Sequence, residues 1–271
     1  MYLSEVLPQQ HWSVIASIKK TYLNFIKYRE ANRISAHFAE YFEPIIAQES
    51  QLRSNAFSIR HRVYCEELHF EPVTDNALER DEFDHYSIHC LLRHIATDAY
   101  AGTVRIVRPQ STSELLPIEK FCLESITHET LHPKLFARDQ ICEISRLAVP
   151  AEYRRRKSDH FDGAATGVIN QAVYSEKELR CFPFIAVGLY LAAATAILAN
   201  DIAHTYVMME PRLARSMSFI GIKFEKIGPT IEYHGKRAPY YINPHLFFAS
   251  LSPGFKAMFD SIIKELNKHN V

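Results

Sequence analysis

The sequence has no excess of charge of either sign. Its 271 residues include 31 lysines and arginines and 31 aspartates and glutamates, which gives a formal net charge of zero at pH 7. Proteins that bind duplex nucleic acid take much of their affinity from surplus Lys and Arg side chains that contact phosphates. The balance therefore argues against a general nucleic-acid-binding protein and leaves room only for a local basic patch.

Cysteine is scarce, and its spacing matches none of the common structural sites. The five cysteines are odd in number and form no CxxC pair and no Cys/His spacing of a metal-ligand set. This pattern is typical of a reducing environment, so we expect a cytoplasmic protein. His85, His89 and His94 lie close together in sequence but have no matching carboxylate or cysteine spacing. We therefore expect no metal site.

The sequence also lacks a long hydrophobic run. Its most apolar window, residues 184–199, is rich in alanine and falls short of the roughly 20 residues that span a bilayer. We interpret it as a buried helix and expect no transmembrane segment. The first residues, MYLSEVLPQQHW, show no basic region followed by an apolar one, so no secretory signal is expected.

What is present is a succession of helical and strand patterns without repeats or low-complexity linkers. With 47% hydrophobic residues, the chain can bury a full core. Helical spacing is seen over residues 12–47, 52–68, 184–199, 211–220 and 255–267. Strand patterns cover residues 86–109 as an antiparallel pair, then 142–149, 203–210, 223–228 and 230–242. This order predicts a mixed α/β sheet with helices on its faces.

The expected strand over residues 142–149, CEISRLAV, carries two charges in an otherwise apolar run. Successive strand side chains point to opposite faces, so Glu143 and Arg146 share a face only if a bulge intervenes. Strict alternation gives one face Glu143, Ser145, Leu147 and Val149, and the other face Ile144, Arg146 and Ala148. Because a buried unpaired charge is unfavourable, each charge needs a partner or a solvated cleft.

Two interpretations of this strand stay open. In the first, a buried pair of Glu143 with Arg146, or partners such as Arg105, only hold the sheet together. In the second, the strand lines an acyl-transfer cleft, where a carboxylate takes a proton from an amine nucleophile and an arginine holds an anionic group. Only the second interpretation accounts for the charged residues that cluster upstream.

Four segments carry a family resemblance: IRHRVYCEE around Arg60, DEFD over 81–84, GTVRIVR over 102–108 and EISRLAV over 143–149. In the same order, they resemble segments of acyl-homoserine lactone synthases and N-acyl amino acid synthases, which belong to the GNAT-like acyltransferase superfamily. The stretch from Met208 to Ile242 resembles most the acyltransferases associated with PEP-CTERM/exosortase systems. Together these matches cover residues 54–243.

The resemblance implies a GNAT-like three-layer α/β/α sandwich with a mixed, mostly antiparallel sheet. Its central strands would splay apart around an acyl thioester on a pantetheine arm. It also implies a bacterial cytoplasmic enzyme with three regions: an N-terminal helical extension (1–50), a GNAT-like acyltransferase domain (51–245) and a C-terminal helix (246–271).

The resemblance also assigns candidate site residues. Glu143 is the candidate general base, acting through water, and Arg105 and Arg146 are candidate catalytic residues that bind a substrate carboxylate or organise the cleft. The candidate substrate-binding residues are Arg60, Asp81, Asp84, Ser145, Leu147 and Val149. A backbone N–H of Leu147 or Val149 could stabilise the tetrahedral oxyanion. Cys142 is expected to be a core cysteine, because alternation points it away from Glu143.

The acyl carrier is predicted from the loop after the charged strand. GNAT enzymes that use CoA usually have a glycine-containing loop there, whose N–H groups hold the pyrophosphate. This chain instead has PAEYRRRKSDHFDG, with Arg154, Arg155, Arg156 and Lys157 where glycines would be expected. A basic loop suits docking of the acidic acyl carrier protein. We therefore expect an acyl-phosphopantetheine thioester on acyl carrier protein, or else on CoA, as co-substrate, and no tightly bound cofactor.

The leading hypothesis is an N-acyltransferase. It would move a long-chain fatty acyl group from the carrier thioester to the amine of an amino acid or a related small molecule. One alternative is an acyl-homoserine lactone synthase that uses S-adenosylmethionine, and another is a catalytically silent GNAT-like module that binds acyl carrier protein. Residues 233–237 are interpreted as a hairpin turn that could lie at the substrate rim, and Met208 and Met209 as core or acyl-tunnel lining.

Overall fold

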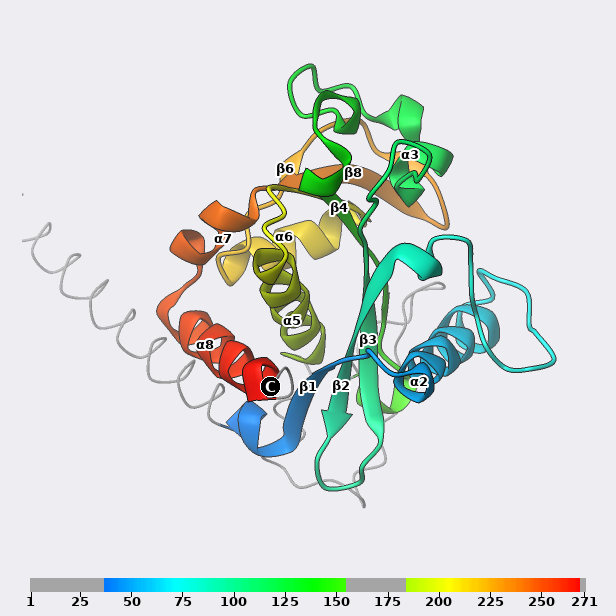
Figure 1. Cartoon of the computed structure of the whole chain (residues 1–271), viewed down its shortest axis with the longest axis vertical. Coiled ribbons are helices and arrows are strands. Elements are labelled where there is room, and N and C mark those ends of the chain that lie inside the picture. Colours follow the sequence, from blue (N-terminus) through cyan, green and yellow to red (C-terminus); the bar gives the residue numbers. More distant parts are fainter. Residues whose placement is uncertain (1–36, 155–183, 269–271) are drawn as a thin grey trace, which may run out of the picture.

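The computed structural model describes residues 37–154 and 184–268, and within them one eight-stranded sheet forms the centre of the molecule (Figure 1). The strands are β1 (Phe42–Ile46), β2 (Ser87–His94), β3 (Tyr100–Val107), β4 (Ile141–Ala148), β5 (His204–Met209), β6 (Glu225–Lys226), β7 (Ile231–Glu232) and β8 (Lys236–Ile242). Their spatial order is β1-β2-β3-β4-β5-β8-β6, with β7 paired to β8. The β4–β5 pair is parallel and the other pairs are antiparallel. The predicted mixed, mostly antiparallel sheet is confirmed.

Helices cover both faces of the sheet, as predicted. On one face, α2 (Ser50–Arg60) continues directly into a π-helical segment, η1 (His61–Glu67), and packs on β2 and β3. On the other face lie α5 (Ile185–Ala199) and α8 (Pro253–Lys268), with α6 (Pro211–Phe219) and α7 (Pro244–Ser250) beside them. An insertion between β3 and β4, with the short helix α3 (Pro117–Phe121), covers the far end of the sheet.

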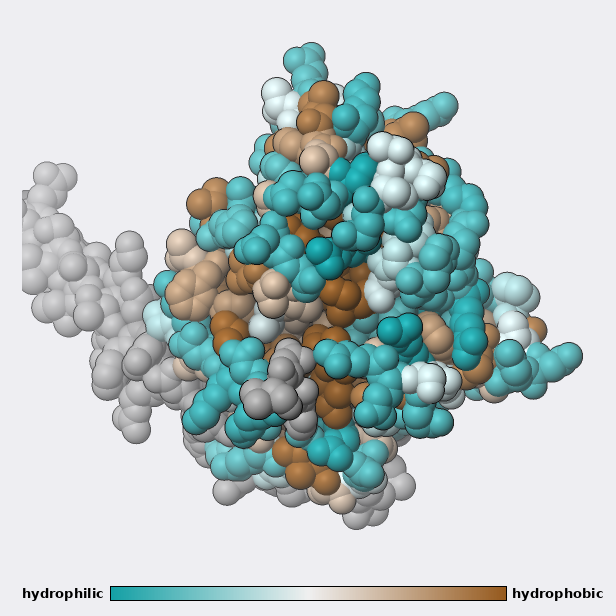
Figure 2. Space-filling model, in the orientation of Figure 1, coloured by the Kyte–Doolittle hydropathy of each residue, from teal (hydrophilic) through white to brown (hydrophobic). Residues whose placement is uncertain are grey.

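The strand pattern of β2 and β3 explains why both faces are covered. Alternate residues, Cys90, Leu92, Val104 and Ile106, fill the core beneath α5. Their neighbour Leu91 packs on the opposite side with Ala56 and Ile59 of α2. Figure 2 shows the result at the surface: hydrophilic residues cover most of the insertion and the α2 side, and hydrophobic residues show toward the centre, between the two helical layers.

Helix α5 is buried on most of its surface, which confirms the interpretation of the most apolar window. Its alanines and Gly188 allow neighbours to approach closely: a Cβ added at Gly188 would lie 2.4 Å from Cζ of Phe38. In the described parts of the chain, no helix has both the length and the hydrophobicity needed to cross a membrane.

Both ends of the described chain differ from the expected regions. Residues 42–46 are not part of a helical extension, because they form β1, an edge strand paired with β2. The helical pattern was wrong here because Phe38 and Phe42, four residues apart, are both buried while the chain changes from helix to strand between them. Residues 1–36 lie outside the described residues. At the other end, two helices, α7 and α8, replace the single expected one, and α8 packs on α5 and β1.

Candidate active site

Strand β4 contains a bulge where it pairs with β3. Thr103 pairs with Ala148 and Arg105 with Ser145, so β4 accommodates one extra residue between these two pairs. Arg146 lies in this bulge with a φ of 51°, in the left-handed region that side-chain-bearing residues seldom adopt. From this point on, the side chains of β4 change faces.

The bulge overturns the predicted alternation for the second half of β4. Ala148 packs with α2 residues, whereas Leu147 and Val149 pack against the core beneath α5. The predictions that Leu147 and Val149 face the same side as Glu143, and that Arg146 faces the other, are therefore wrong. Arg146 extends toward carboxylates on the α2 side, which is the face it shares with Glu143.

Arg60, the last residue of α2, is fully buried and paired on two sides of its guanidinium group. Its Nη1 and Nη2 donate to the two carboxylate oxygens of Asp84 at 2.6 and 3.1 Å, and its Nε donates to Glu79. Such complete pairing is what allows an arginine to be buried, because a buried guanidinium without partners is strongly destabilising.

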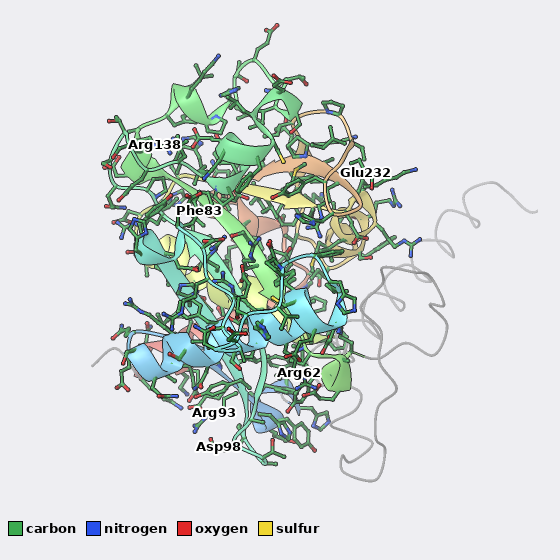
Figure 3. All side chains as sticks on the ribbon, turned by 90° about the vertical axis from the view of Figure 1, so that its right-hand side faces the viewer. Arg62, Phe83, Arg93, Asp98, Arg138 and Glu232 are labelled. Carbon is green, nitrogen blue, oxygen red and sulfur yellow. The ribbon has the colours of Figure 1, made fainter. Side chains whose placement is uncertain are left out.

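Arg105 of β3 extends the same network toward β4. Its Nη1 lies 2.5 Å from Asp81 and 2.9 Å from Asp84, and its Nε donates to the Ser145 hydroxyl at 3.0 Å. Phe83 lies below its guanidinium at 5.6 Å. Figure 3 views this side of the molecule, with Phe83 between α2 and the insertion that carries Arg138.

Arg146 completes the network from the bulge. Its Nη2 lies 3.0 Å from Glu71, 3.1 Å from Glu79 and 3.3 Å from Asp81, and its guanidinium stacks over Tyr64 at 5.5 Å. The Tyr64 hydroxyl in turn donates to the Leu147 carbonyl at 2.7 Å. These contacts tie the bulge to the π-helical segment η1, a helix type that is frequent at functional sites.

The charge network therefore joins five predicted site residues: Arg60, Asp81, Asp84, Arg105 and Arg146. Glu71 and Glu79 also belong to the network but were not among the predicted site residues. Although burial raises the pKa of Glu79 and Asp84, their arginine partners lower both pKa values below the usual range. Glu79 and Asp84 therefore stay ionised at neutral pH.

Glu143 lies outside this network. It is 2% exposed, and its Oε2 accepts a hydrogen bond from the Ile118 backbone N–H at 2.7 Å. Among the described residues, no Lys or Arg nitrogen lies within 4 Å of its carboxylate, so the proposed pairing with Arg146 or Arg105 is not present. Burial raises the pKa of Glu143 to about 8, a value suited to a general acid or base near neutral pH.

A cavity opens where β4 and β5 separate. The two strands pair from Ile141 opposite His204 to Ile144 opposite Val207, and both continue beyond that point without pairing to each other. A cavity of about 520 Å³ lies there. Val187, Leu213, Met217 and Ile220 from α5 and the α6 region give the cavity an apolar surface, beside which the exposed Glu210, Arg212 and Ser216 also line it. Tyr64, Arg146 and Arg237 add polar groups from other elements.

The predicted site residues differ in their access to this cavity. Ser145, Arg146 and Leu147 line it, and so do Met208 and Met209. Glu143, Arg60, Arg105, Asp81, Asp84 and Val149 are not among the lining residues. Glu143 is two residues from Ser145 on the same strand face, so a proton would have to travel between the Glu143 carboxylate and the cavity.

The predicted carrier-docking loop is described only at its first residue. Arg154 is partly buried and forms an ion pair with Glu67 of η1. Burial lowers the pKa of Arg154 to about 10. Its charge is thus already neutralised by this chain. Arg155, Arg156 and Lys157 lie outside the described residues.

Cys142 is a core cysteine, as expected. It is fully buried on the α5 side of β4, its Sγ lies 3.4 Å from the Thr205 hydroxyl, and burial raises the pKa of its thiol to about 12. Of the three histidines considered above, His89 is buried against the ring of Phe57, and His85 is exposed. Within the described ranges, no group of three or more His, Cys, Asp or Glu side chains could hold a metal ion.

The predicted hairpin over residues 233–237 joins β7 to β8. Ile231 pairs with Arg237 and Glu232 with Lys236, and Gly235 takes a φ of 92° in open space at the turn. The hairpin brings Arg237 to the cavity wall. Sequence reasoning marked this turn as a possible rim but did not single out Arg237.

Comparison with known proteins identifies the fold. Residues 59–161 match the family model described as the acetyltransferase (GNAT) domain, and no curated protein matches the sequence. The structure is similar to TofI in a ternary complex with an inhibitor and MTA (TM-score 0.55, 16% identity, 78% of this chain and 98% of that chain covered). It is also similar to the AHL synthase LasI (0.54, 15%, 78% and 96%) and to BjaI, a CoA-dependent acyl-homoserine lactone synthase, with MTA (0.55, 14%, 82% and 89%). The chain therefore has a GNAT-like α/β fold, as predicted.

Replacing Arg60 by Met is expected to destabilise the protein strongly. The variant removes the buried guanidinium that pairs with Glu79 and Asp84, which keep only Arg146 and Arg105 as partners, and breaking a buried ion pair costs about 3–5 kcal/mol. Arg62→Met is the matched control, because the Arg62 side chain is 48% exposed and pairs with Glu152 at the surface, where such a pair contributes about 1 kcal/mol or less. Chemical denaturation measures the free energy of unfolding of both variants. An equal loss of unfolding free energy in the two variants would show that the buried ion pairs of Arg60 contribute no more than a surface pair.

Glu143→Gln is expected to change how stability depends on pH. The unfolded glutamate ionises near pH 4.5, whereas the buried side chain keeps its proton up to about pH 8. Between these values only the unfolded state loses the proton, so the wild-type protein loses stability relative to the variant as pH rises, by up to about 1.4 kcal/mol per pH unit. Denaturation curves at several pH values measure this difference. A constant difference across the window would show that Glu143 titrates normally.

Proposed function

We propose that this protein is an N-acyltransferase that transfers a long-chain fatty acyl group from a phosphopantetheine thioester to the amine of an amino acid or a related small molecule. The observation that supports this most is the cavity between the splayed strands β4 and β5, which combines apolar residues of α5 and α6 with Tyr64 and Arg146 on the α2 side and the exposed Glu210, Arg212 and Ser216. A fatty acyl chain fits the apolar residues and an amine nucleophile the polar ones. The match to the GNAT acetyltransferase domain supports the same reaction class.

In this proposal the acyl thioester lies along β4 past Ile144, where the strand no longer pairs with β5. The amine nitrogen attacks the thioester carbonyl carbon, and a backbone N–H of this unpaired stretch stabilises the oxyanion. The ionised form of Glu143 accepts the ammonium proton through water, because the amine can attack only after it has lost that proton. The fraction of Glu143 in this form rises as the pH approaches its pKa of about 8. The C–S bond then breaks, the thiolate leaves, and no acyl-enzyme forms.

The thioester carrier is either acyl carrier protein or CoA. The predicted basic docking surface is weakened by the pairing of Arg154 with Glu67. One structural relative, BjaI, is described as CoA-dependent, so both carriers belong in the assay. A link to PEP-CTERM/exosortase systems rests on the resemblance of residues 208–242 alone.

Mass spectrometry of lipid extracts from bacteria that express the protein tests the reaction. New N-acylated amino acids should appear with the wild-type chain and fall by at least about 100-fold with Glu143→Gln, the lower range of a general-base contribution. Glutamine keeps the acceptor oxygen for the Ile118 N–H, so folding is preserved. Release of S-adenosylmethionine-derived products would instead indicate a homoserine lactone synthase. Equal product from wild type and variant would remove Glu143 from the mechanism.

Leu213→Trp is expected to shorten the acyl chain that the enzyme prefers. Leu213 is partly exposed in the apolar wall of the cavity, so a larger ring fills space without disturbing a fully buried position. Because each methylene in an apolar pocket changes binding measurably, kcat/KM for the longest chains should fall about tenfold relative to shorter ones. Leu246→Trp, exposed on α7 and absent from the cavity wall, is the control. An unchanged chain-length profile in Leu213→Trp would place the acyl chain elsewhere.

A further inference from the structure

The cavity contains an arginine whose charge this chain does not neutralise. Arg237 precedes Ala238, which pairs with Met209, the last residue of β5. It thus lies at the open end of the splayed strands and lines the cavity. Among the described residues, no carboxylate lies within 4 Å of its guanidinium, and its Nε donates only to the His234 carbonyl, at 3.4 Å. Arg146, in the same cavity wall, is held by three carboxylates.

The Arg237 side chain is partly exposed and lines the cavity. Its positive charge opposes the burial that raises the pKa of Tyr64 on η1, of Cys122 after α3 and of Tyr190 on α5. Tyr64 and Tyr190 themselves line the cavity.

The charge network of Arg60, Arg105 and Arg146 has an excess of negative charge, whereas Arg237 is an unpaired positive charge within the described residues. The network's three arginines face four carboxylates, Glu71, Glu79, Asp81 and Asp84. Glu71 is the most exposed of the four, with 30% of its side chain accessible, and it contacts Arg146 at the cavity wall. One end of the polar wall therefore favours a cation, and Arg237 favours an anion.

We infer that Arg237 binds the carboxylate of the acceptor, so that the acceptor carries a carboxylate beside its reacting amine, as an α-amino acid does. The ammonium group lies toward Glu71 and the network, and the carboxylate lies on the guanidinium of Arg237. This inference rests on the proposed acyl transfer and specifies which amines it uses. We expected Arg105 and Arg146 to bind the substrate carboxylate, but carboxylates of this chain already pair with both guanidinium groups. We therefore assign that role to Arg237.

The test compares acceptors that differ only in the carboxylate. Purified protein is given palmitoyl-CoA or palmitoyl-acyl carrier protein with each of a panel of L-amino acids or the corresponding amino acid amides. Wild-type kcat/KM should favour the acid over its amide by about 10- to 100-fold, the range expected for a hydrogen-bonded ionic contact. In Arg237→Gln this ratio should fall toward one, mainly through a higher KM for the acid.

Lys236→Gln is the matched control. It removes one positive charge from the neighbouring residue of β8, whose side chain is exposed and absent from the cavity wall. It should keep the wild-type ratio. Equal use of acids and amides by the wild type, or an equal loss for both acceptors in Arg237→Gln, would overturn the inference while leaving the acyl transfer established. If no amine is acylated from either donor, the proposed function fails first.

Discussion

The site depends on the bulge that holds Arg146 in a left-handed conformation on β4. A non-glycine residue in this conformation costs about 1–2 kcal/mol, and the contacts that offset the cost come from outside the sheet. Three carboxylates bind the guanidinium, and the Tyr64 hydroxyl bonds the next carbonyl, that of Leu147. The segment from η1 to Asp84 thus determines the conformation of a central strand. Without these contacts, nothing in the sequence of β4 itself favours the bulge over a regular strand.

The same bulge explains how the charges of one strand come to have different roles. It puts Arg146 on the α2 face, within reach of acids that also bind Arg60 and Arg105. Each of those acids pairs with at least two arginines, and the pKa values of Glu79 and Asp84 are lowered as a result. Glu143, three residues earlier, is left beside apolar residues and one backbone N–H. It is therefore the carboxylate of β4 whose proton is exchangeable near neutral pH, whereas the arginines around it are fixed charges.

Much of the fold follows from the sequence because its strongest patterns are local. The strand patterns of β2 and β3 and the uniform hydrophobicity of α5 predict their structure directly. Strand β1 was not predicted because Phe42 continues the helical spacing of the preceding residues. In the structure, however, Phe42 begins an edge strand. The bulge could not be predicted, since an arginine gives no signal for a left-handed backbone. The five network residues were found through family resemblance, whereas Glu71, Glu79 and Arg237 depend on which distant segments the fold brings together.

The sheet itself separates the two substrates of the proposed reaction. Before Ile144, β4 is hydrogen-bonded on both sides and closes the sheet; after it, the loss of pairing with β5 opens a passage from one helical layer to the other. Leu147 faces the α5 side and Arg146 the α2 side of this passage. An acyl chain and an ionic amine have opposite solvation requirements, so the proposed reaction needs an apolar surface for the chain and a polar surface for the amine near the thioester carbonyl. Because of the bulge, the adjacent residues Arg146 and Leu147 of β4 face opposite sides of the sheet. The polar and the apolar surface of the cavity therefore meet at β4.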